Sequence, residues 1–167
     1  MLDALAERHG VEWESAPRGI EGLSGRWRIA DAVLAKPLTF MNLSGGAVVG
    51  LMQFYKVDVV DLLVVVDDVN LDLGRLRARS MGSAGGHNGL RSVIHWLGTE
   101  EFARLRIGVG RGDAQRDLAD HVTAKFEREE RENVAAAVGR AADAAERFVA
   151  EGIAQVMNTF NRKEDAE

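Results

Sequence analysis

The sequence predicts an α/β protein, a single domain in which helices flank a mixed, largely parallel central sheet. Leu62 to Val66 is an unbroken apolar run of strand length, typical of a central strand covered on both faces. Segments of strand character alternate with segments whose apolar residues recur at helical spacing, as in an α/β sandwich. The 167 residues suit one domain. We expect this domain over residues 1–160 and a frayed tail over 161–167.

The first half of the chain predicts helices on both sides of a short strand region. Apolar side chains at helical spacing indicate a helix from residue 2, with no capping side chain before it. Residues 27–35 predict one or two short strands. Helical spacing returns from residue 47 onward, which puts Asn42 and Ser44 near the start of that helix.

The second half continues the alternation. The apolar run of the central strand stops at Asp67 and Asp68, and a glycine-rich loop over 82–89 leads into a short helix that Gly98 closes. Further strands are expected over 75–79 and 105–109, and further helices over 134–148 and 153–160.

Composition excludes several classes of protein. A net charge of -5 argues against a protein that coats nucleic acid non-specifically, so any nucleic-acid site must be local. The absence of cysteine excludes disulfides and zinc-thiolate sites. No apolar run approaches the roughly 18 residues that a membrane span needs, and we find no secretory signal. A soluble, cytoplasmic protein is expected.

Asp67 is the first candidate for chemistry, because ligands of open α/β sheets bind at the carboxyl ends of strands. A carboxylate there can hold a histidine in one tautomer and stabilise the imidazolium that forms when the histidine deprotonates water. It could equally cap a loop, and position alone does not decide. The adjacent Asp68 is expected to be a solvated turn residue on the opposite face of the strand.

The glycine-rich loop is the second candidate, because backbone N–H groups at a helix start favour oxyanions. It has neither the Gly-Lys-Ser/Thr of a nucleoside-triphosphate loop nor the GxGxxG spacing of a dinucleotide fold. His87, at the helix start, suits hydrogen bonding to a substrate as a neutral ring, although lone histidines are more often structural. Asn42 and Asn88 could bind a substrate, but for either one alone helix capping is the favoured interpretation.

Arginine alternates with apolar residues at Arg75, Arg77 and Arg79, which puts three guanidinium groups on one face of a strand. This stripe could bind phosphates, or it could be the solvated face of an edge strand; spacing alone favours the solvated face. The remaining histidines have no acids at metal-ligand spacing, and Ser44 has no nearby base. Neither a metal site nor a serine triad is predicted.

Four motifs in order resemble the bacterial peptidyl-tRNA hydrolase family, and the similarity runs from about Leu2 to Phe160. They are Lys36-Pro37-Leu38-Thr39-Phe40-Met41-Asn42-Leu43-Ser44-Gly45, Asp67-Asp68 after an apolar strand, Gly85-Gly86-His87-Asn88-Gly89-Leu90, and Arg104-Leu105-Arg106-Ile107-Gly108-Val109-Gly110.

The resemblance implies a monomeric esterase that needs no metal or cofactor and cleaves the bond between a peptide and the 3′ ribose of tRNA. It implies that Asp67 orients the catalytic histidine and that Asn42 and Asn88 hold the substrate near the scissile ester. Phe40, Met41, Gly86 and His87 would line the substrate pocket. Arg79 and Arg106 would clamp the tRNA 5′ phosphate.

One departure from the family is serious. The family begins with a strand, a Gly-Asn-Pro-Gly loop and a Thr-Arg-His-Asn segment that carries the general base, and none of these occurs in this sequence. His9 does not match that motif. We therefore expect a domain that lacks its first strand and is a poor enzyme as given. The alternative is a non-catalytic RNA-binding relative of the same fold.

Overall fold

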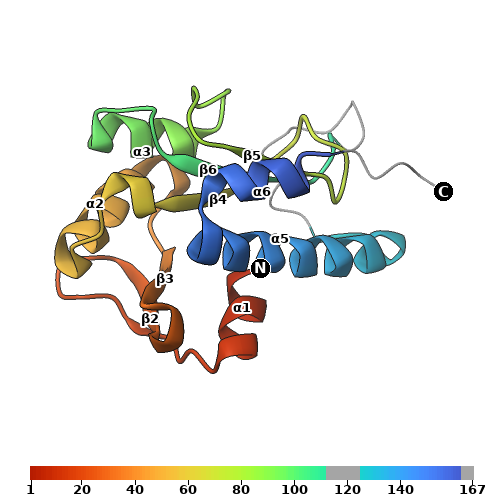
Figure 1. Ribbon diagram of the computed structural model, residues 1–167. Coiled ribbons are helices and arrows are strands. Elements are labelled where there is room, and N and C mark those ends of the chain that lie inside the picture. The colour runs from red at the N-terminus through yellow and green to blue at the C-terminus, as the bar shows by residue number, and fades with distance from the viewer. Residues whose placement is uncertain (112–124, 163–167) are drawn as a thin grey trace. The chain divides into compact units, whose positions relative to one another are not determined.

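Among the residues that the computed structural model describes, 1–111 and 125–162, the strands form two three-stranded sheets. Each sheet lies in a different compact unit, and the two units are described separately. Unit 1 comprises Met1–Leu62 and Ser80–Ala103. Unit 2 comprises Leu63–Arg79 and Arg104–Glu167. Figure 1 shows the elements in chain order.

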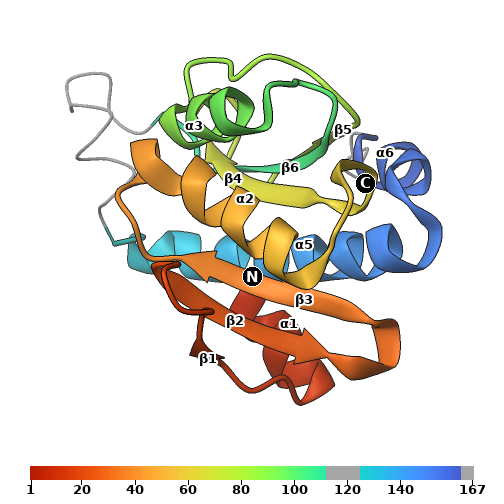
Figure 2. The same ribbon diagram turned by 90° about the vertical axis from the view of Figure 1, so that its left-hand side faces the viewer.

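The first part of unit 1 is a helix followed by an antiparallel hairpin. The helix α1 (Leu2–His9) ends at Gly10, whose φ of 60° is left-handed. The strands β1 (Glu14–Ser15), β2 (Gly22–Trp27) and β3 (Ala32–Pro37) lie in the order β1-β2-β3, and both pairs are antiparallel (Figure 2). The hairpin starts earlier than the predicted 27–35, because Gly22 and Gly25 hide the strand pattern. A Cβ at Gly25 would stand 2.6 Å from the Glu12 carbonyl oxygen, so the close approach of the segment before β1 requires glycine.

The second part of unit 1 packs two helices against each other. The 3-10 turn η2 (Met41–Leu43) leads directly into α2 (Ser44–Tyr55), and α3 (Asn88–Leu97) packs along α2. The predicted closure of α3 at Gly98 is confirmed, with φ 70° at that residue. The short turns η1 (Arg28–Ala30) and η3 (Val59–Asp61) complete the unit.

The sheet of unit 2 has β6 in its middle. The strands β4 (Leu63–Asp68), β5 (Leu76–Arg79) and β6 (Ala103–Gly108) lie in the order β4-β6-β5, and β5 pairs with β6 antiparallel. The α/β class is confirmed. The apolar run predicted as a central strand instead lies at one end of this order, and its residues are only half-buried. The three pairs with a defined register, β1 with β2, β2 with β3 and β5 with β6, are antiparallel.

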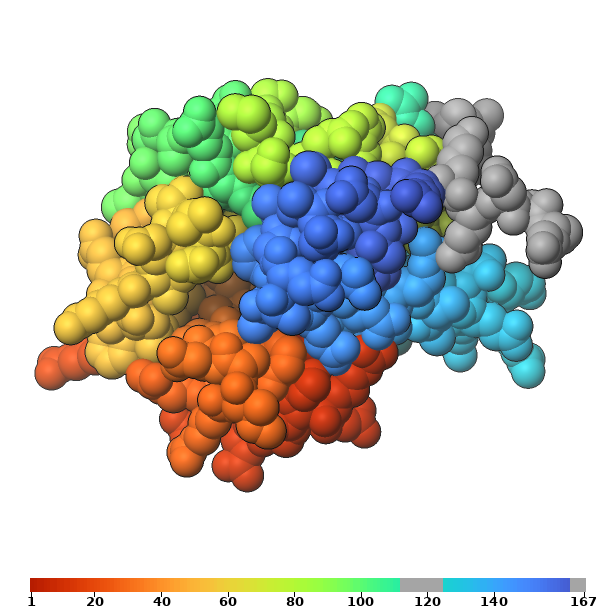
Figure 3. All heavy atoms as spheres, in the orientation of Figure 1, coloured from red at the N-terminus to blue at the C-terminus, as the bar shows by residue number. Residues whose placement is uncertain are grey.

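Two helices complete unit 2. The turn η4 (Arg128–Glu130) precedes α5 (Arg131–Glu151), and Gly152, with φ 83°, allows the sharp corner into α6 (Ile153–Phe160). Alanines of α5 and Val156 of α6 are fully buried. The helix α6 packs on β5 and its outer face is open to solvent (Figures 1 and 3). No helix among the described residues is long and apolar enough to cross a membrane.

The expected frayed tail over 161–167 needs a correction at its first residue. The Asn161 side chain accepts a hydrogen bond from Ala78 N at 2.7 Å and donates one to Ala78 O at 3.0 Å. An amide side chain can satisfy an exposed strand edge in this way, which the composition of the tail did not reveal. Residues 163–167 lie outside the described part of the chain.

Candidate active site

The start of α2 presents three candidate residues to solvent. Phe40 is 81% exposed and Met41 54% exposed, and Asn42 is also exposed. The Ser44 hydroxyl donates to the Met41 carbonyl oxygen at 2.9 Å. This bond fixes the backbone of η2 and gives Ser44 a structural role, so the side chains before it are displayed on a rigid turn.

The glycine-rich loop places His87 at the start of α3. Gly85 and Gly86 have φ of 57° and 84°, a region that side chains disfavour, and His87 N donates to Ala84 O at 3.1 Å across the turn. His87 is the N-cap of α3, and its Nδ1 accepts a hydrogen bond from Leu90 N at 3.2 Å. An accepting Nδ1 carries no hydrogen, so Nε2 carries the hydrogen of the neutral ring.

Neither candidate asparagine caps a helix. The capping bond of α3 comes from His87, and the exposed Asn88 side chain only accepts a long 3.4 Å contact from Arg91 Nη1. The N-caps of η2 and α2 are Phe40 and Leu43, which make no side-chain capping bond. No hydrogen bond of the Asn42 amide occurs within residues 1–111 and 125–162. The capping interpretation is therefore wrong for both asparagines.

Close packing brings these two segments of unit 1 together. A Cβ at Gly45 would lie 2.2 Å from the Ser92 carbonyl oxygen, and a Cβ at Gly89 would lie 2.5 Å from the Met41 sulfur. Gly45 N also donates to Ser92 Oγ at 2.9 Å. The starts of α2 and α3 thus meet through glycines, and Met41 lies against the residue that follows Asn88. Unit 1 therefore assembles residues 40–42 beside residues 86–88.

In unit 2 the two acids at the end of β4 face different surroundings. Asp67 is half-buried, whereas Asp68 is only 8% exposed. The Asp68 carboxylate accepts from Asn70 N at 2.8 Å and from Arg106 Nη1 at 3.1 Å. Asp68 was expected to be a solvated turn residue, and that expectation is wrong. The two acids alternate across the strand as predicted, but the face of Asp68 meets Arg106, which compensates the buried charge.

Two of the three arginines predicted to share one strand face, Arg77 and Arg79, lie on β5, and Arg75 precedes this strand. Leu76 and Ala78 are 2% and 0% exposed, whereas Arg77 and Arg79 are exposed. The register puts Arg77 opposite Arg106 and Arg79 opposite Arg104, so all four guanidinium groups share one face of the sheet. We call these residues the arginine face: Arg77, Arg79, Arg104 and Arg106.

Within the arginine face the four side chains differ in burial. Arg104 is 1% exposed and the Arg106 side chain 15% exposed, so the two arginines of β6 are interior. Arg79 and Arg106, the pair that the resemblance singles out, are diagonal neighbours rather than direct partners, with side chains on the order of 7 Å apart at their bases. Arg106 is moreover already paired with Asp68.

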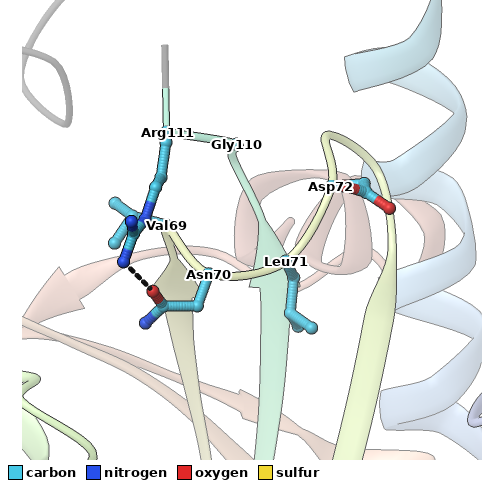
Figure 4. A pocket seen from close by; sticks show the side chains of 6 residues that line it. All are labelled: Val69, Asn70, Leu71, Asp72, Gly110 and Arg111. Carbon is cyan, nitrogen blue, oxygen red and sulfur yellow. Dashed lines mark hydrogen bonds between the residues drawn. The ribbon is translucent and has the colours of Figure 1, made fainter. Parts of the chain in front are cut away.

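A pocket of about 300 Å³ lies beside these strands, but none of the predicted site residues lines it. Its walls are the loop from Val69 to Asp72 with Gly110 and Arg111, and Arg111 Nη2 donates to Asn70 Oδ1 at 3.0 Å (Figure 4).

The other histidines do not form a metal centre. His9 stacks on Trp27 with ring centroids 3.9 Å apart, and His95 is exposed. His121 lies outside the described residues. In the part of the chain that is described, no three histidine, aspartate or glutamate side chains are grouped where they could hold a metal ion.

Comparisons with known proteins agree with this set of motifs. The family model described as peptidyl-tRNA hydrolase matches residues 1–167. A peptidyl-tRNA hydrolase from Symbiobacterium thermophilum is 50% identical over 165 residues, which cover 96% of this chain and 86% of the relative. One from Geobacillus thermodenitrificans is 45% identical over 162 residues, covering 96% and 87%.

Solved structures give the same answer. The crystal structure of a peptidyl-tRNA hydrolase with N-propanol matches with a TM-score of 0.86 at 30% identity, covering 99% of this chain and 84% of the other. The Acinetobacter baumannii peptidyl-tRNA hydrolase matches with a TM-score of 0.85 at 30% identity, covering 96% and 82%. On the sequence match and the fold together, this chain belongs to the peptidyl-tRNA hydrolase family.

Proposed function

We propose that this protein hydrolyses the ester bond between peptide and tRNA in peptidyl-tRNA, and so recycles tRNA during translation. The observation that carries the proposal is that two asparagine amides, Asn42 and Asn88, are both exposed on neighbouring helix starts, in a chain of this family. Helix capping, the structural role that would explain them, is not what they do.

The side chains of unit 1 would bind the acyl end of the substrate. Asn42 and Asn88 each offer N–H donors and a carbonyl acceptor, which can hold the ester and stabilise the oxyanion that develops on its carbonyl oxygen. His87 would donate from Nε2, because Nδ1 is occupied by Leu90 N. Phe40, Met41 and the Gly86 backbone would form the apolar and backbone walls around the substrate.

Asp67 would act on the general base rather than on the ester. A carboxylate at this strand end can bind the ring N–H of a histidine, and the histidine then deprotonates the attacking water. The resemblance to the family implies a histidine in an Arg-His-Asn segment, and the printed sequence does not contain that segment. We propose that residues 1–160 form the hydrolase domain.

The arginine face would bind tRNA. Arg79 is exposed and Arg106 lies diagonally across the sheet on the same face, so together they could contact one phosphate. Phosphate contacts position a nucleic acid without reading its sequence. The proposed enzyme works as a monomer in the cytoplasm, with water as the nucleophile and without metal or cofactor.

Single-turnover release of a labelled acyl-amino acid from tRNA tests the proposal. The assay uses this chain joined, before Met1, to the first strand and the Arg-His-Asn segment of a relative, and we call this protein the extended protein. Asp67→Asn should lower the rate by about 10²-fold or more, because an amide orients the histidine in the wrong tautomer. The matched control is Asp72→Asn, which changes an exposed acid in the loop after β4 and should leave the rate unchanged.

The outcomes separate the two candidate functions. An extended protein that binds tRNA but releases no peptide would identify a non-catalytic RNA-binding relative. Hydrolysis that survives Asp67→Asn at the wild-type rate would remove Asp67 from the mechanism. If the 167-residue chain were as active as the extended one, the general base would be a residue already present here.

A further inference from the structure

The strand β5, which carries two residues of the arginine face, has one unpaired backbone edge, and a single amide side chain forms hydrogen bonds with it. The strand β5 lies at the end of its sheet, so its outer backbone edge has no neighbouring strand among the described residues. At that edge the Asn161 side chain binds both backbone groups of Ala78, at 2.7 and 3.0 Å. Asn161 follows α6, which packs on β5 (Figure 1). The chain thus returns over 83 residues to make this contact.

The geometry of the strand makes Ala78 the informative position. Successive residues of a strand direct their N–H and C=O groups to opposite sides. Because both groups of Ala78 bind Asn161, they point away from β6, and the ladder bonds to β6 come from the flanking Arg77 and Arg79. The backbone of β5 is therefore held from both sides, by β6 at the two arginines and by Asn161 between them.

We propose that Asn161 is a positioning residue for tRNA binding, which fixes the β5 backbone so that Arg79 points its guanidinium group at the phosphate. This inference rests on the proposed function. It assigns to Asn161 no contact with the substrate. Without the amide, an edge of only four residues, Leu76–Arg79, would have an unsatisfied donor and acceptor at its centre and would fray. An arginine on a mobile strand must then lose conformational freedom when it binds, which weakens binding.

The experiment measures the affinity of the extended protein for deacylated tRNA with and without its 5′ phosphate, over a range of salt concentrations. Asn161→Ala should lower the affinity for the phosphorylated tRNA by about three- to tenfold and flatten the salt dependence, as Arg79→Ala does. The rate on a minimal acyl substrate without the 5′ phosphate should stay at the wild-type value, because the site of unit 1 is intact. Asn158→Ala, an exposed asparagine of α6 itself, is the matched control and should bind as wild type.

A double variant distinguishes positioning from a general loss of stability. If Asn161 acts through Arg79, then Asn161→Ala should cost little further affinity in an Arg79→Ala background. If the two substitutions lowered the tRNA affinity additively in the double variant, the proposal would be wrong. It would also be wrong if Asn161→Ala alone left the affinity unchanged. Should the alanine variant not fold, Asn161→Asp keeps the acceptor for Ala78 N and loses the donor to Ala78 O. The loss of tRNA affinity must then exceed that of Asn158→Asp, which adds the same charge within the preceding helix α6; an equal loss would refute the positioning role.

Failure of the proposed function would look different. In that case the wild-type protein would not distinguish phosphorylated from dephosphorylated tRNA, and Arg79→Ala would have no effect. The inference that Asn161 positions Arg79 would then be wrong as well. If wild type and Arg79→Ala behave as proposed and only Asn161→Ala matches wild type, the positioning inference alone is wrong.

Discussion

The candidate groups of unit 1 and those of unit 2 differ in how far they are already engaged. In unit 1, Asn42 and Asn88 lie exposed at helix starts that they do not cap. In unit 2, Asp68 and Arg106 are interior and bound to each other at 3.1 Å. The first arrangement leaves hydrogen-bonding capacity for a substrate, whereas the second uses it to hold the sheet together.

This contrast leads us to expect different roles for the candidate groups of the two units. Groups that stabilise a developing charge must be available when the reaction occurs and must not move to reach it. The glycine contacts between α2 and α3 provide such a rigid platform for the amides. Groups that bind phosphate can act at the surface of a sheet, where only the exposed arginine needs to be free. We therefore expect substitutions in unit 1 to reduce turnover and substitutions on the arginine face to reduce affinity.

The largest effect is expected at the two amides. In the extended protein, Asn42→Ala or Asn88→Ala should lower single-turnover hydrolysis by about 10²-fold or more, because each removes a preorganised donor near the scissile ester. Binding of deacylated tRNA should be unchanged. Rapid mixing with labelled acyl-tRNA measures the rate, and filter binding measures the affinity.

Asn158→Ala again serves as the control, since it removes an exposed asparagine amide from a helix of unit 2. Near wild-type rates for both Asn42→Ala and Asn88→Ala would contradict the role proposed for unit 1. A loss of tRNA affinity without a loss of rate would reverse the comparison between the units.

The sequence predicted where these groups lie along the chain better than it predicted their burial and their long-range partners. Helical spacing located the starts of α2 and α3, and strand alternation located Arg77 and Arg79, because both patterns are local. It did not predict that Asp68 is buried, since this depends on Arg106, 38 residues away. Alternation across the strand could have raised the question, because Asp67 and Asp68 cannot both face solvent on one buried strand.

Long-range contacts explain the other differences. The position of β4 at the end of its sheet and the return of Asn161 to β5 both depend on which segments pair across the fold. The hairpin from β2 to β3 was placed too late because Gly25 hides the strand pattern, and the need for glycine there comes from the close approach of Val11 and Glu12. The spacing of apolar residues along the chain does not indicate which distant segments pair.

An intermediate effect is expected on the arginine face. Arg79→Ala should flatten the plot of log affinity for tRNA against log salt by roughly one unit, because one phosphate contact is lost, with no change in unfolding midpoint. Arg106→Ala should also destabilise the protein, by about 2 kcal/mol, because Asp68 keeps a buried carboxylate oxygen without its charged partner. Binding titrations at several salt concentrations and urea unfolding separate the two.

The control for charge is Arg147→Ala on α5, whose side chain is 40% exposed and pairs with Glu151 on the same helix, at 3.6 Å. It should alter neither the salt slope nor, by more than a few tenths of a kcal/mol, the stability. An unchanged slope in both Arg79→Ala and Arg106→Ala would make the arginine face a solvated surface. Equal stability of Arg79→Ala and Arg106→Ala would show that the Asp68 pair contributes nothing.

The smallest effect is expected at an exposed ion pair of unit 1, which is the opposite extreme from Asp68 and Arg106. Asp3 in the first turn of α1 binds Lys36 of β3, and the Lys36 ammonium also lies 4.3 Å from the centre of the Trp13 ring. The hydrogen bond from Lys36 lowers the pKa of the Asp3 carboxyl below its usual value of 3.8. A carboxyl whose pKa is lower in the folded state stabilises the fold above its unfolded pKa, and this contribution disappears as the pH falls through the folded pKa. The unfolding midpoint of Asp3→Asn should therefore lie slightly below that of wild type at pH 7, and the two should converge in acid and in high salt, where the pair is screened.

Glu7→Gln changes another exposed acid of the same helix and provides the control, so the difference must be larger for Asp3→Asn. A difference that persisted at a pH where the Asp3 carboxyl is protonated in the folded state would mean that Asp3 stabilises α1 by some means other than its charge.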